Sequence, residues 1–76
     1  MITKDTKIYG SFSKNAGSLG TKLFNLAFKY YNINAIYRSF SIDNIEDAVQ
    51  AARTLKFSGF AVSMPYKFST GVQLKI

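Results

Sequence analysis

The chain has 76 residues, enough for one small domain that would bury roughly 60% of the surface its extended form exposes. Hydrophobic residues make up 47% and charged residues 18%, a balance typical of a packed globular core. Because the sequence contains no cysteine and no histidine, it excludes disulfides, thiolate or imidazole metal sites and histidine-based catalysis. Any acid–base catalysis would therefore have to use lysine, tyrosine or a carboxylate.

The charge balance is basic, since ten lysines and arginines against four acidic residues give a formal net charge of +6. Such an excess can attract nucleic acid or an acidic membrane surface. The basic residues are spread at nearly even spacing without a cluster, so nucleic-acid binding is the weaker hypothesis. No window holds the roughly eighteen apolar residues of a membrane span, and residues 1–5 lack a signal-peptide run, which favours a cytoplasmic protein.

The first predicted element is a strand over residues 7–12, rich in β-branched and aromatic side chains. A loop of serine, asparagine and glycine follows, from Ser13 to Gly20. From Thr21 the period changes to that of a helix, and Asn32 is a typical helix stop. The apolar residues with this spacing are at positions 23, 24, 27, 28, 30 and 31.

A second strand is predicted over residues 35–42, because apolar and polar side chains alternate there. The alternation places Tyr37 and Ser39 on one face and the residues between and beside them on the other. We expect Tyr30, Tyr31 and Tyr37 to be core or half-buried packing residues rather than platforms for stacked bases.

The segment from Asp43 to Glu46 has the form of a capping box, in which Asp43 accepts a hydrogen bond from the Glu46 amide. It predicts a second helix that ends near Lys56, whose cation suits a helix C-terminus. A buried type of strand then follows over residues 60–64 and is closed by Pro65.

The resulting order, βαβαβ, predicts an α/β fold with an open parallel sheet. With right-handed crossovers and the helices on both faces, the strand order is 2-1-3. The winding then reverses beside the first strand, and in such sheets ligands bind at this point, outside the carboxyl ends of the strands. We therefore expect a crevice between the Ser13 to Gly20 loop and the Ser63 to Lys67 segment.

Lys67 is the main candidate for chemistry, because Pro65 would hold it at the carboxyl end of a buried strand. Desolvation would lower the pKa of the Lys67 ammonium and let it exchange a proton with a substrate oxygen. An ordinary exposed loop lysine is the alternative interpretation. The serine-rich loop offers hydroxyls and helix amides to a carboxylate or polyol, with turn formation and helix capping as the alternative. Gly17 to Gly20 does not fit the fingerprint G-x-G-x-x-G, so no cofactor loop is predicted.

The last predicted strand runs into the most informative motif of the chain, A-V-S-M-P-Y-K over residues 61–67. It resembles the Asn-Val-Thr-x-Pro-x-Lys motif in the N-terminal, substrate-binding domain of the shikimate dehydrogenases. Val62, Pro65 and Lys67 match this motif. Ser63 keeps the hydroxyl of the family threonine, whereas the alanine departs from the family asparagine. The resemblance implies that Lys67 is the catalytic acid and base and also contacts the substrate.

The resemblance extends from Ile8 to Lys67 and is strongest to the shikimate dehydrogenase-like branch. The family's loop motif, Ser-x-Ser-x-Ser-Pro, corresponds to residues 15–20, where Ala16 replaces one carboxylate-binding serine and Ser18 is kept. The resemblance therefore implies Ser18 and Ser63 as substrate-binding residues. Loss of one hydroxyl leaves open whether the substrate is 3-dehydroshikimate and shikimate or a related hydroxy acid.

Family members continue with an aspartate partner for the lysine and a nicotinamide-binding Rossmann domain, neither of which residues 68–76 resemble. We therefore expect residues 1–67 to be a partial substrate-binding domain and residues 68–76 a divergent tail. The resemblance implies a truncated part of an NADP-dependent oxidoreductase of aromatic amino acid biosynthesis. This chain alone is expected to bind neither NADP nor a metal, and to have no dehydrogenase activity.

The expected partners are a small polyhydroxy-carboxylate substrate and either the missing downstream domain or a second copy of the chain. The alternative is a non-catalytic binding or assembly module. A sheet of three strands is small and has open edges, which another chain or a second copy would complete.

Overall fold

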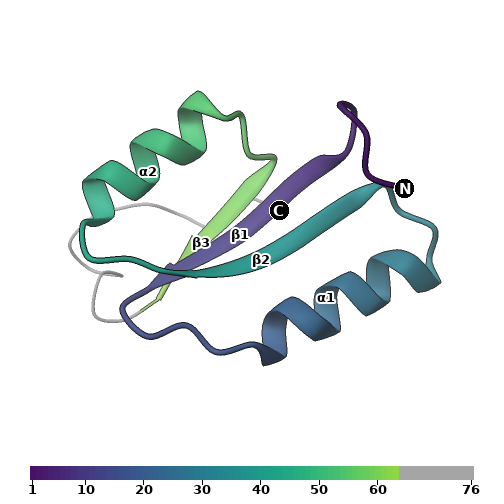
Figure 1. Cartoon of the computed structure of the whole chain (residues 1–76), viewed down its shortest axis with the longest axis horizontal. Coiled ribbons are helices and arrows are strands. Elements are labelled where there is room, and N and C mark those ends of the chain that lie inside the picture. Colours follow the sequence, from purple (N-terminus) through teal and green to yellow (C-terminus); the bar gives the residue numbers. More distant parts are fainter. Residues whose placement is uncertain (64–76) are drawn as a thin grey trace.

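The computed structural model describes residues 1–63, which form a three-stranded parallel sheet with one helix on each side (Figure 1). The elements in chain order are β1 (Lys7–Ser13), α1 (Leu19–Tyr30), β2 (Ala35–Ser41), α2 (Ile45–Thr54) and β3 (Gly59–Val62). The strand order is β2-β1-β3. The predicted α/β fold and its 2-1-3 order are confirmed, and each element lies within a few residues of its predicted range.

The hydrophobic core lies between the sheet and α2. Phe12 of β1 and Phe60 of β3 are buried there, against Ile45 and Ala52 of α2. The Phe12 ring centroid lies 5.6 Å from that of Phe60 and 5.9 Å from that of Phe40, and both pairs are tilted. Tilted aromatic pairs at these distances stabilise a fold beyond the area that they bury. This side of the sheet therefore supplies most of the hydrophobic stabilisation.

On the other side, α1 is joined to the sheet by hydrogen bonds, and none of its residues is buried. Asn25 donates from Nδ2 to the Tyr37 carbonyl at 2.6 Å and accepts at Oδ1 from the Tyr37 amide at 2.8 Å. Thr21 Oγ1 accepts from the Ser39 amide at 3.0 Å. These backbone groups lie on the edge of β2 that faces away from β1, so α1 side chains take the place of a neighbouring strand there.

The start of α2 corrects one prediction. The N-cap is Asn44, whose Oδ1 accepts from the Asp47 amide at 2.9 Å, so the assignment of Asp43 to the capping role was wrong. Because Ile45 is the first helical residue, the preceding residue has the extended backbone of a cap, with φ −126° and ψ 110°. The Asn44 side chain reaches the amide of Asp47, the third residue of the helix.

Both helices end at a left-handed residue other than glycine. Asn32 after α1 has a φ of 55°, and Lys56 after α2 has a φ of 58°. The amides of Lys56 and Phe57 donate back to carbonyls in the last turn of α2, which is the Schellman arrangement. The helix itself ends at Thr54, two residues before the predicted end, because this turn already redirects the backbone toward β3.

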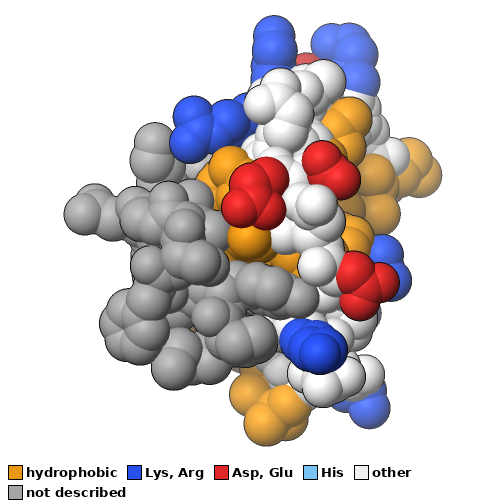
Figure 2. All heavy atoms as spheres, turned by 90° about the vertical axis from the view of Figure 1, so that its left-hand side faces the viewer, with side chains coloured by type: hydrophobic (Ala, Val, Ile, Leu, Met, Phe, Trp, Pro, Cys, Tyr) orange, Lys and Arg blue, Asp and Glu red, His pale blue; other side chains and the backbone are white. Residues whose placement is uncertain are grey.

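Acidic side chains gather on one side of the molecule. Figure 2 shows them in the middle of the face that carries the start of α2, with lysine and arginine side chains around them. Glu46 and Asp47 occupy the first turn of α2, where the helix dipole favours negative charge. Within residues 1–63, no helix has the length and hydrophobicity to cross a membrane, and no acidic cluster suits a metal ion.

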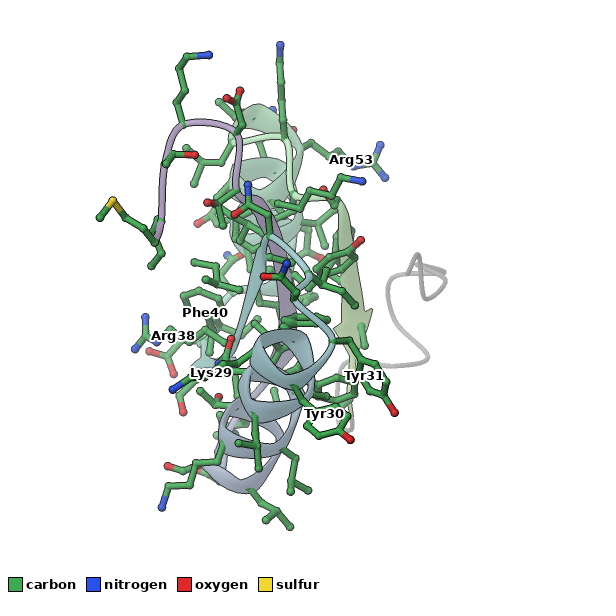
Figure 3. All side chains as sticks on the ribbon, turned by 90° about the vertical axis from the view of Figure 1, so that its right-hand side faces the viewer. Lys29, Tyr30, Tyr31, Arg38, Phe40 and Arg53 are labelled. Carbon is green, nitrogen blue, oxygen red and sulfur yellow. The ribbon has the colours of Figure 1, made fainter. Side chains whose placement is uncertain are left out.

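The prediction for the three tyrosines is wrong for two of them. Tyr30 and Tyr31 are 80% and 69% exposed, and they project from the end of α1 (Figure 3). Tyr37 is half-buried, as predicted, with its ring centroid 4.5 Å from that of Phe24. The side of α1 that faces the sheet carries Asn25 and the Phe24 and Phe28 rings, whereas Tyr30 and Tyr31 at its end lie in solvent.

Candidate functional site

Serine side chains gather at the carboxyl end of the sheet, on the face that α1 covers. Ser11 and Ser13 belong to β1, Ser39 belongs to β2, and Ser63 directly follows β3. Ser11 is paired with Ser39 in the strand register, and side chains alternate along a strand, so these hydroxyls share one face. They line a hollow of about 530 Å³, called here the serine hollow.

The loop between β1 and α1 completes the serine hollow with Asn15, Ala16 and Gly17, and α1 adds its first residues, Leu19 and Gly20. None of the described residues that line this hollow carries a charge. The first turn of α1 contains no acidic residue, so its free amides and its dipole keep their positive potential. The serine hollow is therefore suited to a small ligand with several hydroxyls and one negative group.

A second hollow of about 470 Å³, called here the Ser18 hollow, adjoins the first. Ala16, Gly17 and Ser39 line both hollows and so form the wall between them. Ser18 is the N-cap residue of α1, but its side chain makes no capping hydrogen bond. Its hydroxyl is therefore available to a ligand.

Arg38 is among the residues that line the Ser18 hollow. Its guanidinium carbon lies 4.6 Å from the ring centroid of Phe40, and Figure 3 shows both side chains on the same side of β2. A guanidinium held over an aromatic ring is restrained in position. Among the described lining residues, the Ser18 hollow therefore includes a charged residue and the serine hollow does not.

The structure places two of the three predicted site residues. Ser63 lines the serine hollow, Ser18 lines the adjoining one, and Lys67 lies outside the described residues. Sequence reasoning missed Ser39. The signal was present, because the tripeptide Ser-Phe-Ser occurs at residues 11–13 and again at residues 39–41, and the register aligns the two copies.

Known proteins are similar to this chain in sequence and in fold. The family model described as shikimate dehydrogenase substrate binding domain matches residues 13–73. A shikimate dehydrogenase-like protein from Haemophilus influenzae is 39% identical over 67 residues, which cover 88% of this chain and 25% of that protein. A shikimate dehydrogenase (NADP(+)) from Alkaliphilus oremlandii is 39% identical over 70 residues, which cover 88% of this chain and 24% of that protein.

Solved structures agree with the sequence comparison. A shikimate 5-dehydrogenase-like protein superposes with a TM-score of 0.88 at 37% identity, covering 93% of this chain and 26% of that one. The shikimate 5-dehydrogenase of Listeria monocytogenes, solved in complex with shikimate and NAD, gives 0.76 at 30% identity, covering 84% and 23%. This chain spans about a quarter of the length of these relatives. The resemblance predicted from its motifs is confirmed, and the chain belongs to the family of shikimate dehydrogenase substrate-binding domains.

Proposed function

We propose that this chain supplies substrate-binding residues of a shikimate dehydrogenase-like, NADP-dependent oxidoreductase. Its ligand is shikimate, 3-dehydroshikimate or a related polyhydroxy-carboxylate. The observation that carries this proposal is the serine hollow, where hydroxyls from three strands meet the start of α1. The structure of the Listeria monocytogenes relative in complex with shikimate and NAD supports the same class of ligand.

The chemistry of the serine hollow fits such a ligand. A serine hydroxyl both donates and accepts, so it can pair with a ring hydroxyl in either direction. The amides at the start of α1 accommodate a carboxylate without a cationic side chain.

Lys67 is proposed as the acid and base that moves a proton at the reacting oxygen of the substrate, and it follows Ser63 by four residues in the sequence. Ser18 and Ser63 are proposed as substrate contacts. The printed name of the Alkaliphilus oremlandii relative includes NADP(+), which supplies the hydride chemistry in such an enzyme. Gly17 and Gly20 do not meet the spacing of a dinucleotide-binding turn, so the loop before α1 does not fit this cofactor.

Titration of the isotope-labelled full chain with shikimate, followed by amide NMR, tests ligand binding. We expect saturable shifts at residues of the serine hollow and a dissociation constant raised about fivefold to tenfold by Ser63→Ala, since each such contact contributes about 1 kcal/mol. Ser58→Ala is the matched control, because Ser58 is exposed and precedes β3 at the opposite end of the strand. A shikimate titration without saturable shifts at these residues would contradict the proposal.

The prediction that this chain alone has no dehydrogenase activity has a separate test. Purified 76-residue chain mixed with NADPH and 3-dehydroshikimate should show no oxidation of NADPH, because the chain spans about a quarter of the length of its relatives. Measurable oxidation that Lys67→Ala abolishes would overturn this prediction and assign Lys67 to the mechanism. The domain boundary after Lys67 and the cytoplasmic location also stay predictions.

A second candidate is an assembly module formed by two copies of the chain. It is favoured by α1, which exposes Leu19, Leu23, Leu26 and Tyr30 at spacings of four, three and four residues. Two copies of one helix pack along a stripe with this spacing. The module predicts a melting temperature that rises with protein concentration, and a constant melting temperature contradicts it.

A further inference from the structure

We infer that Ser39 is a further substrate-binding residue, and that Thr21 is the positioning residue for its hydroxyl. This inference rests on the proposed function, because it names a new contact for the same ligand. The ligand atom concerned is an oxygen of the carboxylate.

Ser39 holds a central place in the site. It is half-buried, it lies in register with Ser11, and it lines both the serine hollow and the Ser18 hollow. The two other residues that line both hollows, Ala16 and Gly17, have no polar side-chain atom. Within residues 1–63, Ser39 Oγ is therefore the polar side-chain atom that both hollows share.

Thr21 sets the direction of the Ser39 hydroxyl. Thr21 Oγ1 accepts from the Ser39 amide at 3.0 Å and donates its own proton to Ser39 Oγ at 3.3 Å. A hydroxyl has one proton to donate, and Thr21 uses its proton on Ser39. Ser39 accepts in this pair, so its own proton remains for a ligand oxygen.

Asn25 holds this arrangement in place one helical turn further on. It bonds both backbone groups of Tyr37, while Thr21 bonds the amide of Ser39, two residues along the same strand. Residues four apart lie on one face of a helix, and residues two apart share one side of a strand. Two such attachments fix the rotation of α1, and with it the position of the Thr21 hydroxyl.

The start of α1 identifies the ligand atom. Gly20 and Thr21, in the first turn, are the helical residues beside Ser39. Free amides and the helix dipole favour negative charge at this place, and no acidic residue of the first turn opposes it. A donor that points out from this position meets a carboxylate oxygen rather than an uncharged ring hydroxyl.

Gly20 provides a probe of the same contact. A β-carbon built on Gly20 would lie 3.8 Å from Ser39 Oγ and 3.6 Å from Tyr37 Cε1, which are ordinary van der Waals distances. Gly20→Ala therefore places a methyl group beside the Ser39 hydroxyl without a clash. Alanine is also the better helix former, so the variant should fold at least as stably as the natural chain.

The experiment compares dissociation constants for shikimate and for its methyl ester, measured by NMR titration of the full chain. The ester lacks the negative charge, so the natural chain should bind it more weakly. Ser39→Ala and Gly20→Ala should weaken binding of the acid about tenfold or more and bring the acid and ester constants closer together, as expected for loss of a hydrogen bond to a charged group. Thr21→Val should have the same effect, and Thr21→Ser should restore binding. Ser58→Ala should leave both constants unchanged.

The outcomes separate the two proposals. A natural chain that binds neither ligand overturns the proposed function. If the natural chain binds shikimate and Ser39→Ala leaves the acid and ester constants unchanged, the proposed function stands and the Ser39 contact is wrong. If Thr21→Val lowers the melting temperature with no change in affinity, Thr21 is structural and does not position Ser39. Gly20→Ala keeps the Ser39 contact testable even if Thr21→Val fails to fold.

Discussion

The two faces of the sheet are built on different principles. The α2 face packs aromatic rings against a helix, whereas the α1 face is held by hydrogen bonds to a helix with no buried residue. The same strands supply both faces, because Phe12 and Phe40 each stand between two serines. The two faces therefore differ in role: one provides most of the hydrophobic stabilisation, and the other carries the polar groups of the proposed ligand site.

The largest effect is expected on the α2 face. Phe12→Ala should cost about 3–5 kcal/mol, because it removes the ring at the centre of the aromatic cluster and leaves a cavity. That loss is comparable with the whole stability of a small domain, so the cooperative unfolding transition should disappear. Urea unfolding followed by far-UV circular dichroism measures it. Phe24→Ala, on α1, is the matched control, and an equal loss there would refute the contrast between the faces.

A smaller loss is expected where α1 meets β2. Asn25→Ala should cost about 1–3 kcal/mol, because the Tyr37 amide and carbonyl both lose their partner in a half-buried position. The loss should also speed hydrogen exchange at the Tyr37 amide, which NMR records directly. Asn15→Ala, in the exposed loop, should change stability by less than about 0.5 kcal/mol. Slow exchange in the Asn25 variant would mean that this bond does not protect the strand.

Loss of the N-cap of α2 should lower stability less than loss of Asn25 does. Asn44→Ala should lower the free energy of unfolding by about 1 kcal/mol, because the Asp47 amide loses its acceptor. Asn44→Asp keeps an acceptor oxygen at the same place and should stay within a few tenths of a kcal/mol, about the experimental error. Thermal and urea unfolding of the pair provide the measurement, and equal stabilities would show that this cap is not formed in solution.

The smallest expected effect is a gain in stability. Lys56→Gly should raise stability by about 0.5–1 kcal/mol, because glycine adopts the left-handed backbone there without a steric penalty. Arg53→Gly, inside the last turn of α2, should lower stability by a similar amount. Melting temperatures of the two variants therefore should move in opposite directions. A lower melting temperature for Lys56→Gly would exclude a left-handed conformation at this residue.

The sequence predicts the elements of this fold well because its periods are strong, and it predicts the site less well for identifiable reasons. The strands and helices follow from alternation and helical spacing, and the 2-1-3 order follows from right-handed crossovers. The cap was misplaced because Asp43 and Asn44 both suit that role and local spacing does not separate them. Ser39 was missed because its neighbours belong to another strand and to α1, so only the register brings it into the site.

The side chains that hold α1 against β2 also bear on how this sheet can grow. Along Tyr37 and Ser39 the outward backbone groups of β2 are already occupied by Asn25 and Thr21. An added strand, from this polypeptide or another, could pair there only by displacing the helix. Of the two outer strands described, β3 is therefore the one beside which a further strand can be added without displacing α1. The side chains of Asn25 and Thr21 thus determine at which edge this sheet can be extended.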